Sequence, residues 1–453
     1  MTYAQLEDKF HVIRVQTESL PELCDLLTSS VILLVSMMTA SPNQHSTSVV
    51  GRWSTHHRWM FRILAITFAL IVAVLLAEIT LRLFVPDTRS PYIYDEFTGT
   101  RLEPGHKFVF QSEGYSSNVI NSRGLRDREH ALDKPTDTFR IAILGDSFSE
   151  AFQVAQENTF WSVLERELQA KPEFKNRNVE VINFGVSGFG TIQEWQMLEH
   201  YVGDYAPDLV LLAFLPGNDV RNNSRQLEPD HRRPFAELND GNLRLDFSFR
   251  DDPIEKRFRQ ITWSACKDQV IRHSRVVHLL YRALENWRSR TASQNTPNTG
   301  FTNADEAGID SAVFAPPKID ALREAWEITD RVLEAMQTEC KAVGAKFVVV
   351  ILNNSVEVHP DPAVTLKLAG KLGSADLKEP QRRIIASGQR YGFPVIDLLE
   401  PMEQIAHKDH VFFHGFHNTP PGTGHWNETG HATAGKLIAQ HLAQLLKNTT
   451  SGR

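Results

Sequence analysis

The chain has 453 residues, of which 42% are hydrophobic and 23% charged, as in an ordinary globular protein. This composition excludes collagen-like, fully disordered and disulfide-scaffold proteins, and the three cysteines lack the paired spacing of a thiolate zinc site. The formal net charge is −7 and the isoelectric point is near 6.2, so we expect no nucleic-acid partner. The length suits one large domain with extensions, or two domains.

The most hydrophobic stretch, residues 63–85, predicts a transmembrane anchor. Its first part, Ile63–Ala77, contains no charged residue. The whole stretch reaches the roughly 20 residues that span a bilayer. Glu78 and Arg82 are four residues apart and can pair on one helix face. A cleaved signal peptide is the alternative, but no small-residue cleavage site follows.

The flanking charges predict the orientation of this anchor. Arginines without acids precede it, whereas several acids follow it. The positive-inside rule then predicts a single-pass protein of the inner (cytoplasmic) membrane. Residues 1–62 would be cytoplasmic, and the chain after about residue 87 would be periplasmic or extracellular. We interpret the first 37 residues as an over-extended gene start, because Met38 would begin a compact basic leader.

A repeating pattern of strands follows an extended polar segment, residues 87–138, here called the leading segment. Five short runs rich in Val, Ile and Leu lack clear alternation, which is typical of strands buried on both faces of a parallel sheet. These runs are Phe139–Leu144, Val179–Asn183, Leu209–Phe214, Lys346–Leu352 and Val395–Leu398.

Helices are predicted between these strands, and together the two kinds of element predict a parallel α/β/α sandwich. The helices are expected at Thr159–Ala170, residues 191–201, Leu322–Val343 and Ala432–Leu446. Residues 220–318 interrupt the alternation, and we interpret them as an insertion. It would contain a helix at Val270–Trp287 and a flexible low-complexity tract at Thr291–Gly308.

Four loops place reactive groups near the carboxyl ends of the strands, where such sheets bind ligands. Ser147 directly follows the first strand in a Gly-Asp-Ser sequence, and its hydroxyl can act as a nucleophile beside a base. Gly185 follows the second strand and allows close approach of a backbone N–H. Asn218 follows the third and can donate to an oxyanion. His425 precedes the last helix and can act as the base. Each signal alone is modest, because such sequences are also common turns.

The order of these signals resembles that of the SGNH hydrolases, also called GDSL-like lipases and esterases. Gly-Asp-Ser follows the first strand, Gly the second and Gly-Asn-Asp the third, and a histidine precedes the last helix. The resemblance covers residues 139–446, and the sequence NSRGLRD at Asn121–Asp127 is similar to the leader of membrane-anchored members. It implies a flavodoxin-like three-layer α/β/α sandwich with a five-stranded parallel sheet.

The resemblance also implies a role for each of these residues. Ser147 would be the nucleophile, and His425 would be the general base and then the acid. The N–H groups of Ser147 and Gly185 and the side chain of Asn218 would form the oxyanion hole. The implied reaction is acyl transfer through an acyl-serine, for which no cofactor is needed.

The sequence departs from the family at the carboxylate that orients the histidine. The family usually has an aspartate three residues before it, or two before it in some polysaccharide-acetylating members. Gly422 and Thr423 occupy these positions here. Asp409 or Glu428 would have to substitute, or a backbone carbonyl would hold the ring in a Ser–His dyad. Loss of the third member weakens a triad without abolishing its activity.

Six histidines within 25 residues suggest a metal site as a rival interpretation. No HExxH motif or carboxylate cluster accompanies them, so we expect no metal. We expect His431 to pack against or cap the last helix. The six are His407, His410, His414, His417, His425 and His431.

Together these patterns favour a membrane-anchored serine esterase acting on small acyl esters, acetyl above all, of a carbohydrate or lipid. One alternative is O-acetyl transfer to a surface polysaccharide, which would use the same residues with a sugar hydroxyl as acceptor. The other is a weakly active or inactive glycan-binding protein, which the missing aspartate motivates. The sequence leaves the acyl length, the alcohol, the oligomeric state and the role of the insertion open.

Overall fold

A computed structural model describes residues 55–251, 274–292 and 311–450. The expected over-extended start lies outside the described residues, as does most of the expected low-complexity tract. The chain divides into two compact units, Met1–Ile71 and Val72–Arg453. The boundary falls within the first described helix, α2, Thr55–Phe84.

Helix α2 contains the segment for which a membrane anchor was predicted. Its part Trp59–Phe84 is long and apolar enough to cross a membrane, by length and composition alone. Most of its large apolar side chains are exposed rather than packed in a protein core. Glu78 and Arg82 form the predicted pair, with 2.8 Å between Glu78 Oε1 and Arg82 Nε.

The leading segment is more ordered than its polar composition suggested. It folds into two antiparallel hairpins, each a two-stranded sheet. In the first, β1 (Tyr92–Asp95) pairs with β2 (Gly99–Leu102), and in the second, β3 (Lys107–Phe110) pairs with β4 (Ser116–Val119).

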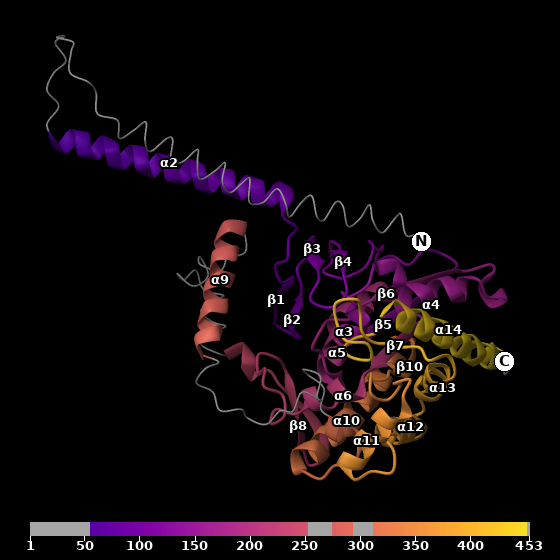
Figure 1. Ribbon diagram of the computed structural model, residues 1–453. Coiled ribbons are helices and arrows are strands. Elements are labelled where there is room, and N and C mark those ends of the chain that lie inside the picture. The colour runs from indigo at the N-terminus through magenta and orange to yellow at the C-terminus, as the bar shows by residue number, and fades with distance from the viewer. Residues whose placement is uncertain (1–54, 252–273, 293–310, 451–453) are drawn as a thin grey trace, which may run out of the picture. The chain divides into compact units, whose positions relative to one another are not determined.

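The five predicted strands form one parallel sheet, as expected (Figure 1). Its spatial order is β6-β5-β7-β10-β11, which in chain order is 2-1-3-4-5 and therefore flavodoxin-like. The strands are β5 (Thr138–Gly145), β6 (Asn178–Asn183), β7 (Leu209–Phe214), β10 (Lys346–Ile351) and β11 (Val395–Asp397).

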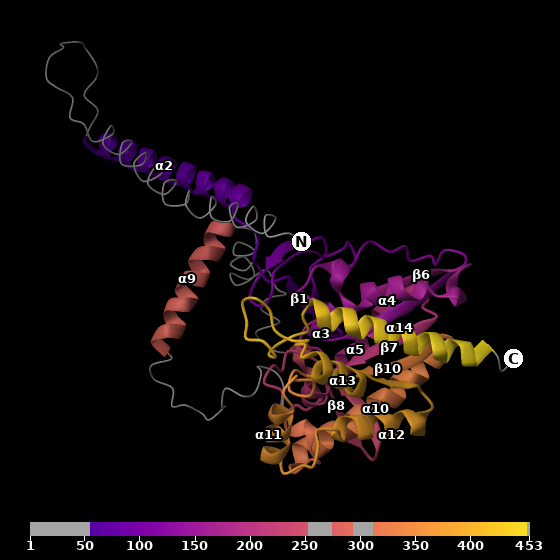
Figure 2. The ribbon, with the colours of Figure 1, turned by 45° about the vertical axis from the view of Figure 1, so that its right-hand side comes forward.

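Helices cover both faces of this sheet, so the three-layer prediction is also confirmed. Alternate side chains of β5 pack in two separate cores, one on each face of the sheet. Ala142 and Leu144 belong to the first core, and Ile141 and Ile143 belong to the second. The first core includes α5 (Thr191–Met197), α10 (Asp320–Ala342), α11 (Pro362–Leu372) and α12 (Glu379–Tyr391). The second includes α4 (Phe160–Gln169), α13 (Leu399–Asp409) and α14 (Glu428–Thr450), with α4 and α14 side by side in Figures 1 and 2.

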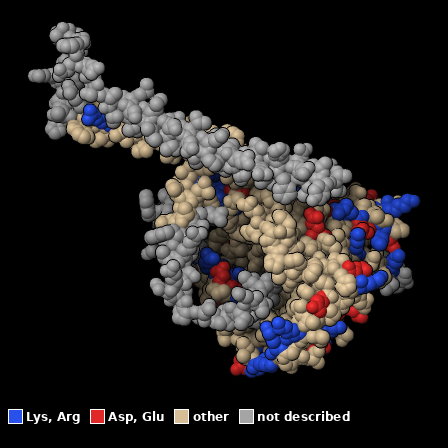
Figure 3. Space-filling model, viewed as in Figure 1, with Lys and Arg blue, Asp and Glu red and all other residues tan. Residues whose placement is uncertain are grey.

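Two short helices stand at the carboxyl edge of the sheet, α3 (Ser147–Glu150) after β5 and α6 (Pro216–Asp219) after β7. The described part of the expected insertion contains a hairpin of β8 (Phe235–Asn239) and β9 (Asn242–Asp246), and helix α9 (Arg275–Ala292). On the face shown in Figure 3, Lys and Arg side chains lie among Asp and Glu side chains rather than forming one continuous basic surface.

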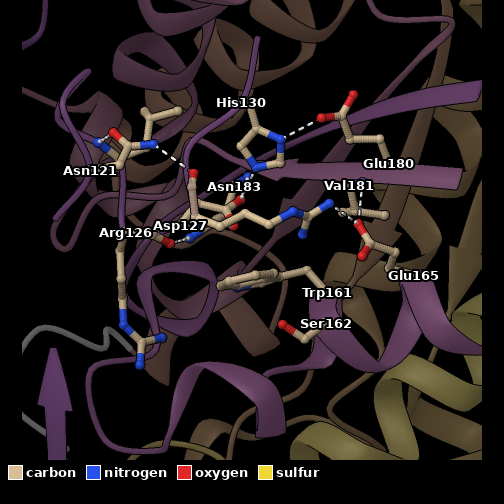
Figure 4. A network of polar contacts seen from close by, with 12 residues as sticks. Asn121, Arg126, Asp127, His130, Trp161, Ser162, Glu165, Glu180, Val181 and Asn183 are labelled. Carbon is tan, nitrogen blue, oxygen red and sulfur yellow. Dashed lines mark hydrogen bonds and ion pairs between the residues drawn. The ribbon is translucent and has the colours of Figure 1, made fainter. Parts of the chain in front are cut away.

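The outer edge of β6 is closed by side chains (Figure 4). Its N–H groups at Val179, Val181 and Asn183 donate to Gln169 Oε1, Glu165 Oε2 and Asp127 Oδ2, at 2.8, 2.8 and 2.9 Å. Unpaired edge strands invite pairing with other chains. These three acceptors satisfy the backbone donors that such pairing would use.

The NSRGLRD sequence joins the leading segment to the sheet. Arg126 is buried, and its guanidinium donates to the carbonyl oxygens of Glu150 at 2.8 Å and Val154 at 2.6 Å. Its neighbour Asp127 is the residue that accepts from β6. The leading segment therefore holds the C-terminal end of α3, the helix that begins with Ser147.

Candidate active site

Ser147 and His425 lie together at the carboxyl edge of the sheet. His425 Nε2 is 2.8 Å from Ser147 Oγ, which is hydrogen-bonding distance. The two residues are 278 positions apart in the chain, so only the fold brings them together. This is the pairing that the sequence predicts for a nucleophile and its base.

The position of Ser147 follows from the sharp change from strand to helix after β5. Asp146 caps α3 by accepting the N–H of Phe148 at its Oδ1, 3.0 Å away. The helix ends after one turn at Ala151, whose φ of 55° is left-handed. Ser147 is thus the first residue of α3, and its hydroxyl is partly accessible at the sheet edge.

His425 lies on the loop between α13 and α14, which the protein core holds in place. The next residue, Trp426, is fully buried and donates its indole N–H to Asn353 Oδ1 at 3.1 Å. A β-bridge joins Trp426 to His414. The Phe148 ring lies 5.0 Å from the His425 ring, centroid to centroid. These contacts fix the loop, while the side chain of His425 remains 24% exposed to solvent.

A carboxylate that the sequence analysis did not consider contacts His425. Glu113, on the loop between β3 and β4, places Oε2 2.6 Å from His425 Nδ1. Its Oε1 accepts the backbone N–H of His425 at 2.7 Å. The side chain of Glu113 is 14% exposed.

The carboxylates that were expected to substitute for the missing aspartate lie elsewhere. Asp409 is exposed at the end of α13. Glu428 is exposed at the start of α14, and its Oε1 accepts from Asn158 at 3.3 Å. Glu113 and Ser147, rather than Asp409 or Glu428, contact the two ring nitrogens of His425.

Asn218 lies on α6, beside the strand–helix turn that carries Asp146 and Ser147. Its Nδ2 donates to Asp146 Oδ2 at 2.8 Å, and its Oδ1 accepts from Asn222 Nδ2 at 3.4 Å. One carboxylate therefore caps the helix of the serine and also orients the amide of Asn218. An amide nitrogen has two hydrogens, so the second remains available for a ligand.

Gly185 is placed differently from its expected role in the oxyanion hole. Its N–H donates to the side-chain Oδ1 of Asn183 at 3.1 Å, so the group is already engaged. Glycine is required here for packing, because an added Cβ would lie 2.8 Å from the backbone nitrogen of Glu150. The oxyanion expectation for Gly185 therefore does not fit this geometry.

Gly188, three residues further along the same loop, has an N–H that donates no hydrogen bond within the described residues. Its φ of 77° is one that side chains disfavour. Its carbonyl accepts from Asn222 Nδ2 at 3.1 Å, and that amide also contacts Asn218. From the sequence, only Gly185 of this loop was named, and its N–H is accepted by Asn183.

Three buried carboxyl groups lie behind the site. Both carboxyl oxygens of Glu194 and Oδ1 of Asp219 have no hydrogen-bond partner in the described structure. Burial, together with the nearby charge of Asp146, raises the pKa of Glu194 well above its usual value. Burial and the charges of Glu194 and Asp146 do the same to the pKa of Asp219. Burial also raises the pKa of Asp146, against the hydrogen bond from Asn218.

The six C-terminal histidines do not converge on one point. His414 and His431 are buried, and burial lowers the pKa of each to about 3. As expected, His431 packs: its Nδ1 accepts the N–H of Phe160 at 3.2 Å. His410 and His417 are exposed. Among the described residues, no group of three or more His, Cys, Asp or Glu side chains is arranged to hold a metal ion.

No family model and no curated protein matches the sequence. Among solved structures, the chain is similar to a lipolytic protein of the G-D-S-L family from Desulfitobacterium hafniense, at 11% identity and a TM-score of 0.31. That match covers 66% of this chain and 98% of the other. A lipase/acylhydrolase from Enterococcus faecalis matches at 15% identity and a TM-score of 0.33, covering 67% of this chain and 95% of that one. An acetyl xylan esterase matches at 11% identity and a TM-score of 0.35, covering 67% of this chain and 99% of that one.

Proposed function

We propose that the protein is a serine acyl hydrolase that cleaves esters through an acyl-serine intermediate. The observation that supports this most directly is the 2.8 Å contact between His425 Nε2 and Ser147 Oγ. The contact lies at the carboxyl edge of a flavodoxin-like sheet, where such folds bind their ligands. A serine at a sharp strand–helix turn with a base on its hydroxyl is the arrangement needed for nucleophilic attack.

The two residues would share the proton transfers of the reaction. His425 Nε2 takes the proton of Ser147 Oγ as that oxygen bonds to the ester carbonyl carbon. The imidazolium then gives the proton to the departing alcohol, as the ester C–O bond breaks. Water attacks the acyl-serine in the second half, with His425 again acting as base and then as acid.

The negative charge that develops on the carbonyl oxygen needs donors that are already in position. We propose the N–H groups of Ser147 and Gly188 and the second amide hydrogen of Asn218. The two N–H groups make no other hydrogen bond within the described residues, and Asp146 holds the amide of Asn218. Gly188 here replaces Gly185, whose N–H is engaged by Asn183.

For the substrate we propose small acyl esters, acetyl above all, on a carbohydrate or lipid. This follows from the resemblance of the Ser, Asn and His motifs to the SGNH hydrolases. We also propose that Trp59–Phe84 anchors the protein in the inner membrane, with its N-terminus cytoplasmic. The apolar length of this helix and the arginines that precede it support this arrangement.

The first experiment is labelling of the full-length protein, in detergent, with a fluorophosphonate probe for activated serines. Wild type should be labelled, Ser147→Ala should not, and His425→Ala should label at least 100-fold more slowly. Ser149→Ala is the matched control, because this hydroxyl belongs to the same short helix but is buried. Folded wild type that takes up no probe, or a Ser147→Ala variant that is still labelled, would refute the proposal. Release of acetate from acetylated oligosaccharides and lipids would then define the substrate.

A further inference from the structure

We propose that Glu113 is the carboxylate that orients His425, supplied by the leading segment instead of by the histidine's own loop. This inference rests on the proposed function. The positions that hold an aspartate in the family pattern are Gly422 and Thr423, neither of which has a carboxylate. The place of the missing group is taken by a hairpin that precedes the first strand of the sheet.

Glu113 uses both of its carboxylate oxygens on the same residue. Oε2 lies 2.6 Å from the ring Nδ1 of His425, and Oε1 accepts the backbone N–H of His425 at 2.7 Å. Because an ionised carboxylate only accepts, Nδ1 must carry the hydrogen in this contact. Nε2 of the neutral ring is then the lone-pair nitrogen, and it faces Ser147 Oγ. The contact therefore selects the tautomer that can take the serine proton.

The loops that carry the two residues are fitted to each other. Asn418, on the histidine's loop, accepts the N–H of Gly114 at 2.8 Å and donates to the carbonyl of Gln111 at 3.0 Å. Gly424, directly before His425, has a φ of 75°, and an added Cβ there would overlap Glu113 Oε1. Asn418 thus holds the main chain on either side of Glu113, and the missing side chain of Gly424 leaves room for the carboxylate.

This geometry gives Glu113 a positioning role rather than direct contact with substrate. When His425 takes the proton of Ser147, the ring becomes positive 2.6 Å from the Glu113 carboxylate. The carboxylate stabilises that positive charge, and no proton needs to reach it. The arrangement is a complete Ser–His–Glu triad whose members come from three distant parts of the chain.

Glu113→Gln tests this role with little change of shape. A glutamine has one oxygen, so it must turn an NH₂ group either toward the backbone N–H of His425 or toward Nδ1. If the NH₂ group faces the backbone N–H of His425, the hydrogen bond to that N–H is lost. If it faces Nδ1, the ring proton must move to Nε2, which faces the serine. We expect kcat/KM for a small acetyl ester to fall about 10²- to 10⁴-fold in the full-length variant. The acid limb of its pH profile should move to lower pH, because the imidazolium loses a neighbouring negative charge.

Asp409→Asn and Glu428→Gln are the matched controls, since each neutralises an acid near the same loop in the sequence. Both should retain wild-type kcat/KM. Added formate should restore part of the activity of Glu113→Ala and none of the activity of Ser147→Ala. A merely structural role for Glu113 would not produce rescue by a small carboxylate.

The outcomes separate this inference from the proposed function. If wild type reacts with the fluorophosphonate but Glu113→Gln keeps its rate and pH profile, Glu113 has no such role and the esterase proposal stands. If Asp409→Asn or Glu428→Gln causes the loss instead, the inference is overturned as well. The downfield proton resonance of a short Nδ1–H···O bond, present in wild type and lost in Glu113→Gln, tests the contact even in a protein without esterase activity.

Discussion

Glu113 binds His425 through both the ring and the backbone N–H, across 312 positions of sequence. A single side chain thereby sets both the rotation of the imidazole and the position of its main chain. The effective pKa and tautomer of a catalytic histidine depend on its second ring nitrogen. The leading segment is for this reason part of the candidate active site and not only a connection to the anchor.

Gly424→Ala should disturb this contact without touching either side chain directly. The new methyl group would overlap Glu113 Oε1, and φ at this position is 75°. We expect kcat/KM to fall at least 10-fold while the protein stays folded, because the carboxylate must move from the ring. Gly241→Ala, in the turn between β8 and β9, imposes similar backbone strain at φ 79° with no atom nearby. Steady-state kinetics and thermal unfolding of both variants test this, and equal losses of activity would contradict it.

Asp146→Asn should weaken the oxyanion hole through Asn218. In the wild type, Asp146 Oδ2 accepts from Asn218 Nδ2 at 2.8 Å. The asparagine variant keeps an oxygen to cap the N–H of Phe148 but turns an NH₂ group toward Asn218 Nδ2, so that hydrogen bond is lost. We expect kcat to fall about 10- to 100-fold, and Asn218→Ala to cost about 10²- to 10³-fold. A double-mutant cycle should show that Asp146→Asn costs little once Asn218 is alanine. Fully additive losses would mean that Asp146 acts by another route.

The buried acids should make the protein less stable as the pH rises. The pKa of Glu194 is raised in the folded state, so the stability present below its unfolded value near 4.5 is lost as the pH climbs toward the folded value. While only the folded state holds the proton, this loss is about 1.4 kcal/mol per pH unit. Glu194→Gln should flatten the fall of unfolding free energy with rising pH above the unfolded value, measured by urea unfolding over a series of pH values. Glu237→Gln, at an exposed position on β8, should leave the slope unchanged.

Removal of the side chains that close β6 should expose a reactive sheet edge. Glu165→Ala with Gln169→Ala frees the N–H groups of Val181 and Val179. We expect a loss of about 1 kcal/mol per hydrogen bond and new concentration-dependent self-association. Urea unfolding and light scattering would measure both. Glu167→Ala on the same helix is the control, and association in that variant would point to a cause other than the edge.

The sheet and the position of Ser147 at its edge could be predicted because they depend on local patterns. Each buried strand is a short run of branched residues, and the bounds observed for β7, Leu209–Phe214, are those expected. Ser147, Asn218 and His425 directly follow strands or precede the last helix, so knowledge of the sheet alone places them at one edge. The leading segment was less well foreseen, since hairpins such as β3–β4 have few residues and little alternation.

Glu113 could not be found in this way. Its surroundings, Gln-Ser-Glu-Gly-Tyr, have the composition of any polar turn. Its function depends on a contact between two loops that are remote in the chain. Gly188 was not considered from the sequence, and it differs from Gly185 in that Asn183 accepts the N–H of Gly185 whereas the N–H of Gly188 donates to no described residue. A sequence signal that could have pointed to Glu113, but was not used, is Gly424, a glycine beside the histidine that leaves room for another side chain.

The distances of Glu113, Ser147 and His425 along the chain also bear on synthesis. Chains fold progressively from the N-terminus as they emerge from the ribosome. Glu113 and Ser147 emerge early, but His425 follows 278 positions after Ser147, on the loop before α14, which packs against α4. A nascent chain that stops before residue 425 therefore contains Ser147 and Glu113 without the histidine that joins them. The proposed hydrolytic activity can therefore begin only after His425 and helix α14 have been made.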